Sequence, residues 1–472
     1  MTAKMAPGTS MDGFHIAEKI HQGGMSTLWR VTRPDVSFPM IMKVPRLEYG
    51  DDPAAIVGLE VEQMIMPTLS GPHVPRFVAA GNFTIQPYIV MEYINGPSLR
   101  ARLDDSPLLP EEVAVLGARL ATALHDLHRQ HVIHLDIKPS SVIFRPGGEA
   151  VLIDYGLAHH NQLPDLLAEE FHLPLGTGPY MSPEQVLGVR SDPRSDLFAL
   201  GVTLYHLATG QRPFGNPTTV SALRRRLYRD AAPPRAIHPN CPPWLQEIIL
   251  HCLEVDPAAR YGSAGQVAFD LQHPAQVVLT SRAQRTARDG FITVAKRWFA
   301  IAGDESRGKS SVADQLSSVP IVMAAVDVTP GNEALAEVLR DTVRSVLQTQ
   351  HGARLACVYI RKISRVAIDS NVDEDGQNLH LQLLAGLRHW ARTLGTPTNR
   401  LTFHVLEAHD AATAIVDFAQ SNHIDHIVIG ARGSSPLRRY LGSVSSQVVA
   451  QATCTVTVVR APGSQESPPE PV

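Results

Sequence analysis

The pattern of hydrophobic and polar positions changes twice along this chain of 472 residues. Over residues 14–271, short apolar stretches come first, and amphipathic stretches of helical period follow after Leu109, as in residues 111–128. Over residues 320–460, apolar stretches of strand length alternate with helical ones. Such alternation is typical of a parallel sheet that helices cover on both faces. The pattern therefore predicts a strand-rich lobe, a helical lobe and then an α/β domain.

Three segments show neither pattern. We interpret residues 1–13 as a flexible N-terminus and the proline-containing residues 461–472 as a disordered tail. Residues 272–319 are expected to form a linker, in which apolar residues near helical spacing at 291–299 predict a short amphipathic helix. Docking of this helix on a neighbouring domain is favoured over contact with a membrane surface.

Composition narrows the classes of function. Hydrophobic residues make up 44% of the chain, and the formal net charge of −4 gives no electrostatic reason to expect a nucleic-acid partner. The sequence has no run of the roughly 18 apolar residues that a membrane-spanning helix needs, and its start does not resemble a signal peptide. The four cysteines are scattered without metal-binding spacing, which predicts reduced thiols in the cytoplasm.

Five short motifs follow one another in the first region, and their order is more specific than any one of them. They are IHQGGMSTLWRV from Ile20, MIMKVP from Met40, YIVMEYINGPSL from Tyr88, HLDIKPSS from His134 and DYG from Asp154. This series resembles the eukaryotic-like Ser/Thr protein kinases of bacteria, over essentially all of residues 14–271. The resemblance implies a multidomain protein that begins with a bilobal kinase fold of the α+β class.

The resemblance assigns a glycine-rich loop to the phosphates of ATP. Gly23 and Gly24 belong to this loop, but His21 and Ser26 replace two glycines of the family pattern. Backbone N–H groups that bind phosphate are retained after such replacements. The added side chains, however, hinder the close approach of the loop backbone to phosphate that glycine allows. Looser binding of ATP is the expected result.

Further nucleotide contacts follow from the next two motifs. Lys43 stands where the family lysine reaches the α and β phosphates, and Glu62 is the expected helix partner that orients it. A solvated Lys and Glu pair is the disfavoured alternative, because apolar residues surround Lys43. The backbone groups of Glu92 and Ile94 are expected to contact adenine.

The loop from His134 carries the expected chemistry of transfer. The resemblance makes Asp136 the base for the substrate hydroxyl and Lys138 the cation near the transferred phosphoryl group. Asp154 is the expected magnesium ligand. Ser141 replaces the family asparagine that binds a second magnesium ion. Its shorter hydroxyl predicts a weaker ligand, with a loss of roughly 10- to 100-fold in affinity or rate.

Leu135 stands where the family has an arginine that binds a phosphorylated activation loop. Residues 157–176, which form that loop, contain no Ser, Thr or Tyr. Both halves of the usual switch are therefore missing, which predicts a kinase without activation-loop control. Farther on, the resemblance places Thr177 near the catalytic aspartate.

Residues 320–460 resemble the universal stress protein family, whose fold is a doubly wound α/β domain with a five-stranded parallel sheet. Asp327 ends the first strand, and the glycine pattern with Gly430, Gly433, Gly442 and Ser443 resembles a phosphate-binding motif whose spacer is one residue short. We expect ATP or a related nucleotide here, although these glycines could instead serve only a tight turn. The resemblance also implies a homodimer formed through the last strand.

Together these motifs favour a Ser/Thr protein kinase that uses ATP and magnesium and phosphorylates protein substrates, with a nucleotide-binding stress-sensing or dimerisation module after it. The alternative is a pseudokinase scaffold that binds nucleotide and partners without catalysis. Retention of Lys43, Asp136, Lys138 and Asp154 favours the enzyme, because a binding module does not need the proposed base.

Overall fold

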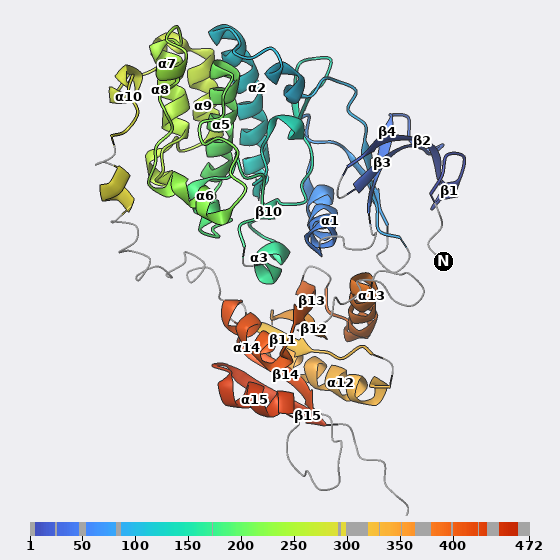
Figure 1. The fold of residues 1–472 in the computed structure, drawn as a ribbon. Helices are drawn as coiled ribbons and strands as arrows, with labels where there is room; N and C mark the ends of the chain where they lie inside the picture. Colours follow the sequence, from blue (N-terminus) through green and yellow to red (C-terminus); the bar gives the residue numbers. More distant parts are fainter. Residues whose placement is uncertain are drawn as a thin grey trace, which may run out of the picture. The chain divides into compact units, whose positions relative to one another are not determined.

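The computed structural model describes most of the chain, in stretches separated by short gaps: residues 5–23, 26–46, 53–81, 86–171, 173–290, 294–298, 320–329, 331–350, 352–363, 379–397, 400–422, 424–431 and 443–460. The chain divides into two compact units, coloured from blue to yellow and from orange to red in Figure 1. Several predicted features lie outside the described residues, namely Gly24, Gly433, Gly442, residues 299–319 and the tail 461–472.

The first unit begins with an antiparallel sheet in the strand order β1-β2-β3-β4-β6-β5. Its strands are β1 (Ser10–Met11), β2 (Phe14–Gln22), β3 (Ser26–Thr32), β4 (Met40–Pro45), β5 (Phe77–Ala80) and β6 (Ile89–Glu92). Alternate residues point to one face, where Phe14, Ile16, Val31, Met40 and Met42 form a buried core. One helix, α1 (Pro53–Ile65), accompanies this sheet and contacts β4.

The rest of the first unit is mostly helical. Its helices are α2 (Pro110–Arg129), α3 (Leu166–Glu170), α4 (Pro183–Val186), α5 (Arg194–Thr209), α6 (Val220–Arg224), α7 (Pro234–Ile237), α8 (Pro243–Cys252), α9 (Ala264–Gln272) and α10 (Ser281–Gln284). Nearly every residue of α5 is buried, and α2 and α8 both pack against this helix. A helix buried on all sides acts as the central support of its lobe.

Two small antiparallel sheets carry the loops of the candidate site. β7 (Val132–Ile133) pairs with β10 (His159–His160), and β8 (Val142–Phe144) pairs with β9 (Ala150–Leu152). The stretch between β7 and β8 holds the HLDIKPSS motif, and the stretch after β9 holds DYG. Both motifs therefore project from short, buried pairs of strands.

Part of the segment expected as a linker packs on the helical lobe. Glu247 of α8 accepts hydrogen bonds from the N–H groups of Thr280 and Ala283 at 2.9 and 3.0 Å, and it pairs with Arg282 at 2.8 Å. Of the predicted amphipathic helix at 291–299, the structure describes residues 294–298, and these are helical. The packed part of the first unit thus continues well beyond Leu271.

The second unit is built on a five-stranded parallel sheet in the order β13-β12-β11-β14-β15. Its strands are β11 (Ile321–Ala325), β12 (Arg354–Lys362), β13 (Leu401–Ala408), β14 (His426–Ala431) and β15 (Thr455–Arg460). The first strand lies in the middle, so the chain winds outward from it in both directions. This topology confirms the predicted doubly wound class and places a switch point between β11 and β14.

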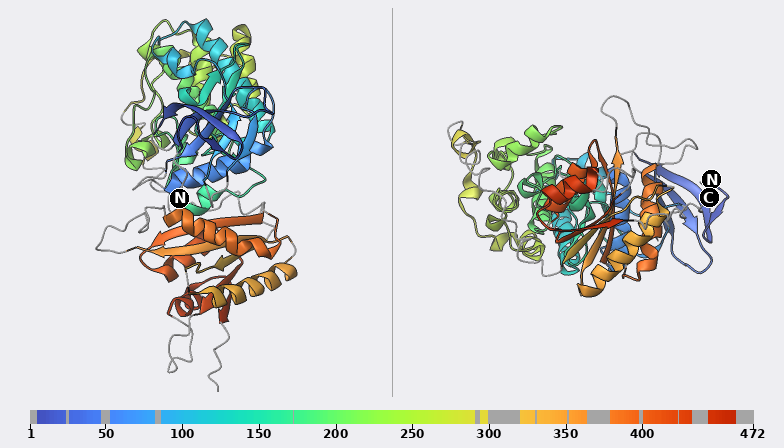
Figure 2. Two further views of the ribbon diagram at one scale, coloured as in Figure 1. Left: turned by 90° about the vertical axis from the view of Figure 1, so that its right-hand side faces the viewer. Right: turned by 90° about the horizontal axis from the view of Figure 1, so that it is seen from below.

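Helices cover both faces of this sheet (Figure 2). α12 (Glu333–Thr349) and α13 (Leu379–Ala391) contact each other, and α14 (Ala411–Ser421) and α15 (Ser443–Gln451) contact each other over the other face. The buried side chains of α14 and α15 join those of the central strands in one core, which includes Met323, Ile427, Ile415, Phe418 and Val448. Burial on both faces explains why these strands are almost continuously apolar.

Candidate active site

Lys43, Glu62 and Asp154 meet in the first unit from three different elements. Lys43 lies in β4, Glu62 lies in α1, and Asp154 follows β9. The Nζ atom of Lys43 is 2.6 Å from Oε2 of Glu62 and 2.7 Å from Oδ1 of Asp154. The structure thus contains the expected pair of Lys43 with Glu62 and adds a direct contact to Asp154.

Burial and charge set the protonation of this cluster. Burial would lower the pKa of Lys43, but the charges of Asp154 and Glu62 outweigh it and raise that pKa. The charge of Lys43 holds the pKa of Asp154 well below its usual range. Burial raises the pKa of Glu62, and Lys43 opposes this rise. Asp154 is consequently a carboxylate at neutral pH, which is the form that binds a cation.

The backbone is held in an uncommon conformation on both sides of the site. Leu135 has φ 60° and Asp154 has φ 71°, in the left-handed region that non-glycine residues seldom adopt. A Cβ atom on Gly58 of α1 would lie 3.1 Å from the carbonyl oxygen of Gly156. Glycine at position 58 therefore allows α1 to approach the DYG segment closely, which brings Glu62 within reach of Lys43.

Asp136 is buried and held by groups from the segment after the activation loop. Its Oδ1 atom accepts a hydrogen bond of 2.9 Å from the N–H group of Thr177. Lys138 donates from Nζ to Oδ2 of Asp136 and, over 3.1 Å, to Oγ1 of Thr177. A carboxylate, an ammonium group and a hydroxyl thus converge from two segments that are about 40 residues apart in sequence.

The hydroxyl of Ser141 is engaged by the backbone of its own loop. It accepts a hydrogen bond from the N–H group of Lys138 at 3.0 Å. Carbonyl oxygens of Lys138 and Asp136 lie 2.9 and 3.2 Å from Oγ and can accept its single proton. Ser141 is buried, so its first observable role is to close the turn that presents Asp136 and Lys138.

A buried carboxylate fixes the start of this loop. Asp196 of α5 accepts hydrogen bonds of 2.8 Å from the N–H groups of both His134 and Leu135, and its Oδ2 atom lies 2.9 Å from Nε2 of His128. Gln185 donates to the carbonyl oxygen of Leu135 over 2.8 Å. These bonds stabilise the left-handed backbone of Leu135.

The expected adenine-contact segment is braced by an ion pair that the motifs do not reveal. Glu92 ends β6, and Ile94 follows two residues later; both are buried. Arg145 binds Glu92 through two nitrogens, at 2.6 and 3.0 Å, and these contacts help to lower the pKa of Glu92 against the opposing effect of burial. In the glycine-rich loop, the N–H group of Gly23 donates to the carbonyl oxygen of Ser26 over 2.9 Å.

The activation segment is anchored by a carboxylate. Asp165 accepts hydrogen bonds from Nε of Arg190 at 2.8 and 3.1 Å, and Nδ1 of His159 lies 3.2 Å from the same carboxylate. Asp165 also accepts from the N–H group of Ala168, which caps α3, and α3 packs against α1. Burial would raise the pKa of Asp165, but His159 and Arg190 hold it well below its usual range.

The chemistry of the donors fits a magnesium ion that is shared with phosphate. Asp154 is an ionised carboxylate with about half of its side chain exposed. Within the described residues, no three or more His, Cys, Asp or Glu side chains gather as a metal site. Mg²⁺ usually takes one or two carboxylates together with substrate phosphates and water, so a single strong protein ligand suits it.

The second unit contains a cavity of about 620 Å³ at the carboxyl edge of its sheet. It is bounded by the ends of β11, β12 and β14 and by the first turns of α12, α14 and α15. This position is the switch point of the doubly wound sheet, where ligands of such folds bind. Of the predicted residues, Asp327, Gly430 and Ser443 line the cavity.

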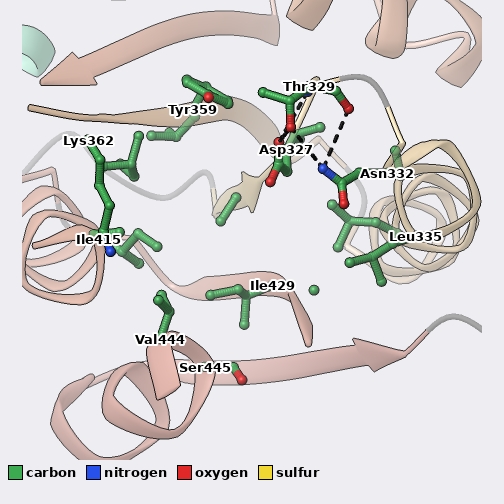
Figure 3. Close-up of a pocket in the computed structure, with 18 of the residues that line it drawn as sticks. Asp327, Thr329, Asn332, Leu335, Tyr359, Lys362, Ile415, Ile429, Val444 and Ser445 are labelled. Carbon is green, nitrogen blue, oxygen red and sulfur yellow. Dashed lines mark hydrogen bonds between the residues drawn. The ribbon is translucent and has the colours of Figure 1, made fainter. Parts of the chain in front are cut away.

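Polar groups in this cavity lie on two sides of an apolar middle (Figure 3). Oδ1 of Asp327 accepts hydrogen bonds from the N–H group and the hydroxyl of Thr329, at 3.1 and 2.5 Å, and Asn332 donates to that hydroxyl over 2.8 Å. Lys362 lies on the other side. The motifs did not point to Thr329, Asn332 or Lys362, because their roles depend on where the strands end.

Gly430 allows a close contact at the edge of the same cavity. A Cβ atom at this position would lie 2.8 Å from Cδ2 of Leu335, so only glycine fits without a shift of the α12 side chain. This packing is a reason for glycine at position 430 that does not depend on a ligand. The position of Gly430 on the lining agrees with the expected ligand site.

Comparison with known proteins gives two family matches. Residues 14–274 match the protein kinase domain, and residues 319–460 match the universal stress protein family. A probable serine/threonine-protein kinase of Clostridium perfringens is 29% identical over 260 residues, which cover 55% of this chain and 38% of that protein. Serine/threonine-protein kinase PknL of Mycobacterium bovis is 30% identical over 258 residues, which cover 54% of this chain and 64% of that protein.

A third relative extends farther along this chain. Serine/threonine-protein kinase PknB of Mycolicibacterium smegmatis is 27% identical over 371 residues, which cover 72% of this chain and 59% of that protein. The matched regions therefore span less than two thirds of the length of each of these three relatives. In the part of this chain that the structure describes, no helix is both long and apolar enough to cross a membrane.

Proposed function

This chain belongs to the protein kinase family and carries a universal stress protein domain after the kinase domain, and from this premise we propose that it transfers the γ-phosphoryl group of ATP to Ser or Thr hydroxyls of proteins. One observation carries the proposal most directly. Asp136, Lys138 and Thr177 converge in one hydrogen-bonded group, which supplies a base, a cation and a positioning hydroxyl at one point.

In the proposed reaction, each residue has one task. Asp136 orients the substrate hydroxyl and accepts its proton, while Lys138 stabilises the negative charge on the transferred group. Lys43, held by Glu62, binds the phosphates of ATP and fixes their position. Asp154 would hold magnesium, with Ser141 as a weaker second ligand, and the ion would neutralise charge on the phosphates.

The nucleotide's base is expected along the backbone of Glu92 and Ile94. The pair of Arg145 with Glu92 supports this, because it keeps the end of β6 in place without using the backbone groups that adenine would need. Gly23 and Gly24 would approach the phosphates, with Gly24 outside the described residues. All of these contacts belong to the proposal.

The C-terminal domain is proposed to bind ATP or a related nucleotide in its cavity. The apolar middle suits a flat base, Asp327 suits hydroxyl or N–H donors, and Lys362 with Ser443 suits phosphate. Gly433 and Gly442 would complete the phosphate loop. β15 is the last strand at its side of the sheet, which supports a homodimer formed through this edge.

A cytoplasmic location is part of the same proposal, and it is supported by four cysteines that are all unpaired in the structure. Sedimentation velocity tests the proposed homodimer, because a monomer at every concentration would contradict it. Acid hydrolysis of protein labelled with γ-phosphate from ATP tests the reaction. We expect phosphoserine or phosphothreonine in the hydrolysate. Recovery of all label as inorganic phosphate, from acid-labile groups, would contradict transfer to hydroxyls.

A further inference from the structure

The helical lobe of the first unit contains a cavity of about 480 Å³ that the proposed reaction does not use. The loop after α5, from Gln211 to Thr218, forms one side of it. α6, the single 3-10 turn η4 (Arg225–Leu227), the segment 229–232, residues 288–289, Tyr205 of α5 and Ile237 of α7 also line it. All of these elements belong to the same compact unit as the candidate active site.

Positive charge dominates the lining. Among the described residues, the charged ones at the cavity are five arginines, Arg212, Arg225, Arg226, Arg229 and Arg288, and two aspartates, Asp230 and Asp289.

Both aspartates are already neutralised. Asp230 pairs with Arg285 at 3.3 Å and with Arg297 at 2.8 Å, and Asp289 pairs with the same two arginines at 2.9 and 3.0 Å. Neither Arg285 nor Arg297 is among the lining residues. The two carboxylates are therefore paired with arginines outside the lining. The positive charge of the lining arginines is left uncompensated.

Within the described residues, four of the lining arginines have no carboxylate partner. Across the described part of the chain, none of Arg212, Arg225, Arg229 and Arg288 has an Asp or Glu oxygen within 4.0 Å. Arg225, Arg229 and Arg288 are exposed to solvent. Exposed guanidinium groups that surround a hollow are suited to bind carboxylates through paired hydrogen bonds.

Arg226 connects this charge to the candidate active site. Its side chain is buried, and it donates to the carbonyl oxygens of Gly178, at 2.8 Å, and Met181. Burial lowers the pKa of Arg226 to about 10, so it is still charged at neutral pH. Among the described residues, Arg226 donates hydrogen bonds only to neutral carbonyl groups, so its charge adds to the positive potential of the cavity.

Residues that line the cavity contact the segment that holds the proposed base, Asp136. A Cβ atom on Gly178 would lie 2.9 Å from the carbonyl oxygen of Pro217, which lines the cavity. Gly178 directly follows Thr177, whose N–H group donates to Asp136. Since an extended peptide advances about 3.3 to 3.6 Å per residue, a substrate whose hydroxyl meets Asp136 reaches the cavity within a few residues.

We propose that this arginine-lined cavity binds acidic side chains of the protein substrate, located a few residues from the Ser or Thr that accepts phosphate. The proposal deepens the kinase function and rests on it. The small net charge of the whole chain, −4, favours local recognition of an acidic segment over general binding of polyanions. Recognition of charge at a surface also steers association, so the preference should weaken as salt is added.

The test uses the full chain and three peptides of equal length with one Ser acceptor. One peptide is neutral around the acceptor, one carries three Glu residues on its N-terminal side, and one carries them on its C-terminal side. The variant Arg225→Glu/Arg229→Glu reverses charge at the cavity, and Arg225→Lys/Arg229→Lys preserves it. Arg129→Glu, at the exposed end of α2, is the control for reversal of an exposed charge away from the cavity.

We expect kcat/KM for one acidic peptide to exceed that for the neutral peptide by about tenfold at low salt. This ratio should fall to about one in the Glu variant and persist in the Lys variant and in Arg129→Glu. Equal values for neutral and acidic peptides in the wild type, or an acidic preference that survives charge reversal, would overturn the proposal.

Binding measured without ATP separates this proposal from the proposed function. Fluorescence anisotropy of a labelled acidic peptide should show binding to the wild type and no binding to the Glu variant. The thermal unfolding midpoint of the Glu variant shows whether that variant is folded. If no peptide receives phosphate, the kinase function fails, and the anisotropy result still decides whether the cavity binds acidic segments.

Discussion

Ser141 is the residue at which the structure adds most to the sequence. From the motif alone it is a shortened metal ligand. In the structure, its hydroxyl is bonded to the backbone of Lys138 and lies near the carbonyl oxygen of Asp136, so the serine also holds the turn that presents both charged groups. An asparagine amide could donate to a carbonyl oxygen in the same way and still offer its own oxygen to a cation.

We predict that Ser141→Asn lowers the Mg²⁺ concentration needed for half-maximal phosphate transfer by about tenfold, because a carbonyl oxygen is gained at the second metal position. Titration of activity with Mg²⁺ at saturating ATP measures the effect. Ser140→Asn, at the exposed neighbouring position, is the matched control and should leave the titration unchanged. An unchanged Mg²⁺ requirement in Ser141→Asn would rule out a metal-binding role for this position.

Residue contacts differ in how far the sequence predicts them. Lys43 and Glu62 could be paired from motif spacing, because one lies in a recognisable strand and the other in a recognisable helix. The pair of Glu92 with Arg145 could not, since 53 residues separate the partners and neither belongs to a motif that names the other. Long-range ion pairs of this kind follow from the packing of whole elements.

At the scale of elements, the activation segment shows how a loop can be ordered without phosphate. Leu135 cannot bind phosphate, and Asp165 instead gathers Arg190 and His159 around a permanent carboxylate. This cluster caps α3, which packs on the helix that carries Glu62. We infer that the segment is held in place by charges encoded in the sequence, in agreement with the predicted lack of activation-loop control.

We predict that Asp165→Asn loosens this segment and lowers phosphate transfer about tenfold, because Arg190 loses its charged partner. Limited proteolysis between residues 157 and 176, together with initial rates, measures both effects. Asp104→Asn, at an exposed position, is the control. Equal protease sensitivity and equal rates in the two variants would contradict the anchoring role.

The same substitution has a pH dependence of known sign. The pKa of Asp165 is lowered in the folded protein, so its contribution to stability is complete above the ordinary carboxyl pKa of about 4 and is lost as the pH falls. Thermal unfolding should therefore show the largest difference between wild type and Asp165→Asn near neutral pH. A difference that grows towards pH 3 would contradict the sign.

Elements with strong apolar periodicity could be predicted from the sequence, and polar ones could not. The parallel sheet of the second unit follows from its continuous apolar strands. Residues 280–285, by contrast, are mostly polar and were expected within the linker, yet they pack on α8 because Glu247 satisfies their N–H groups and Arg282. Docking by a buried carboxylate leaves no periodic signal.

At the scale of the whole molecule, the chain combines a kinase domain and a universal stress protein domain, each with its own candidate nucleotide site. Because residues 157–176 contain no Ser, Thr or Tyr, regulation from the second domain is the hypothesis that the domain combination favours. Such coupling requires that nucleotide at one site change the behaviour of the other. The sequence predicted both domains, but it did not place Lys362 or Asn332 at the second site.

We predict two nucleotide sites per chain. Asp327→Asn should lower the affinity of one site for ATP by about tenfold, because the substitution removes the carboxylate charge at one side of the cavity. Equilibrium dialysis with labelled ATP measures stoichiometry and affinity. Asp417→Asn, on the exposed side of α14, is the control. The hypothesis of regulation adds that the kinase rate at saturating ATP changes in Asp327→Asn, and one site per chain or an unchanged rate would contradict it.

The central claim is catalysis by the group formed by Asp136, Lys138 and Thr177, and one measurement tests it most directly. Phosphate transfer from labelled ATP with Mg²⁺ and ATP binding should be measured side by side for the wild type and Asp136→Asn. We predict that transfer falls by roughly 10²- to 10⁴-fold while ATP affinity is unchanged, because the base is removed and the phosphate contacts stay. If the wild type and the variant both bind ATP and are equally inactive, the claim of catalysis is contradicted. A nucleotide-binding scaffold is then favoured.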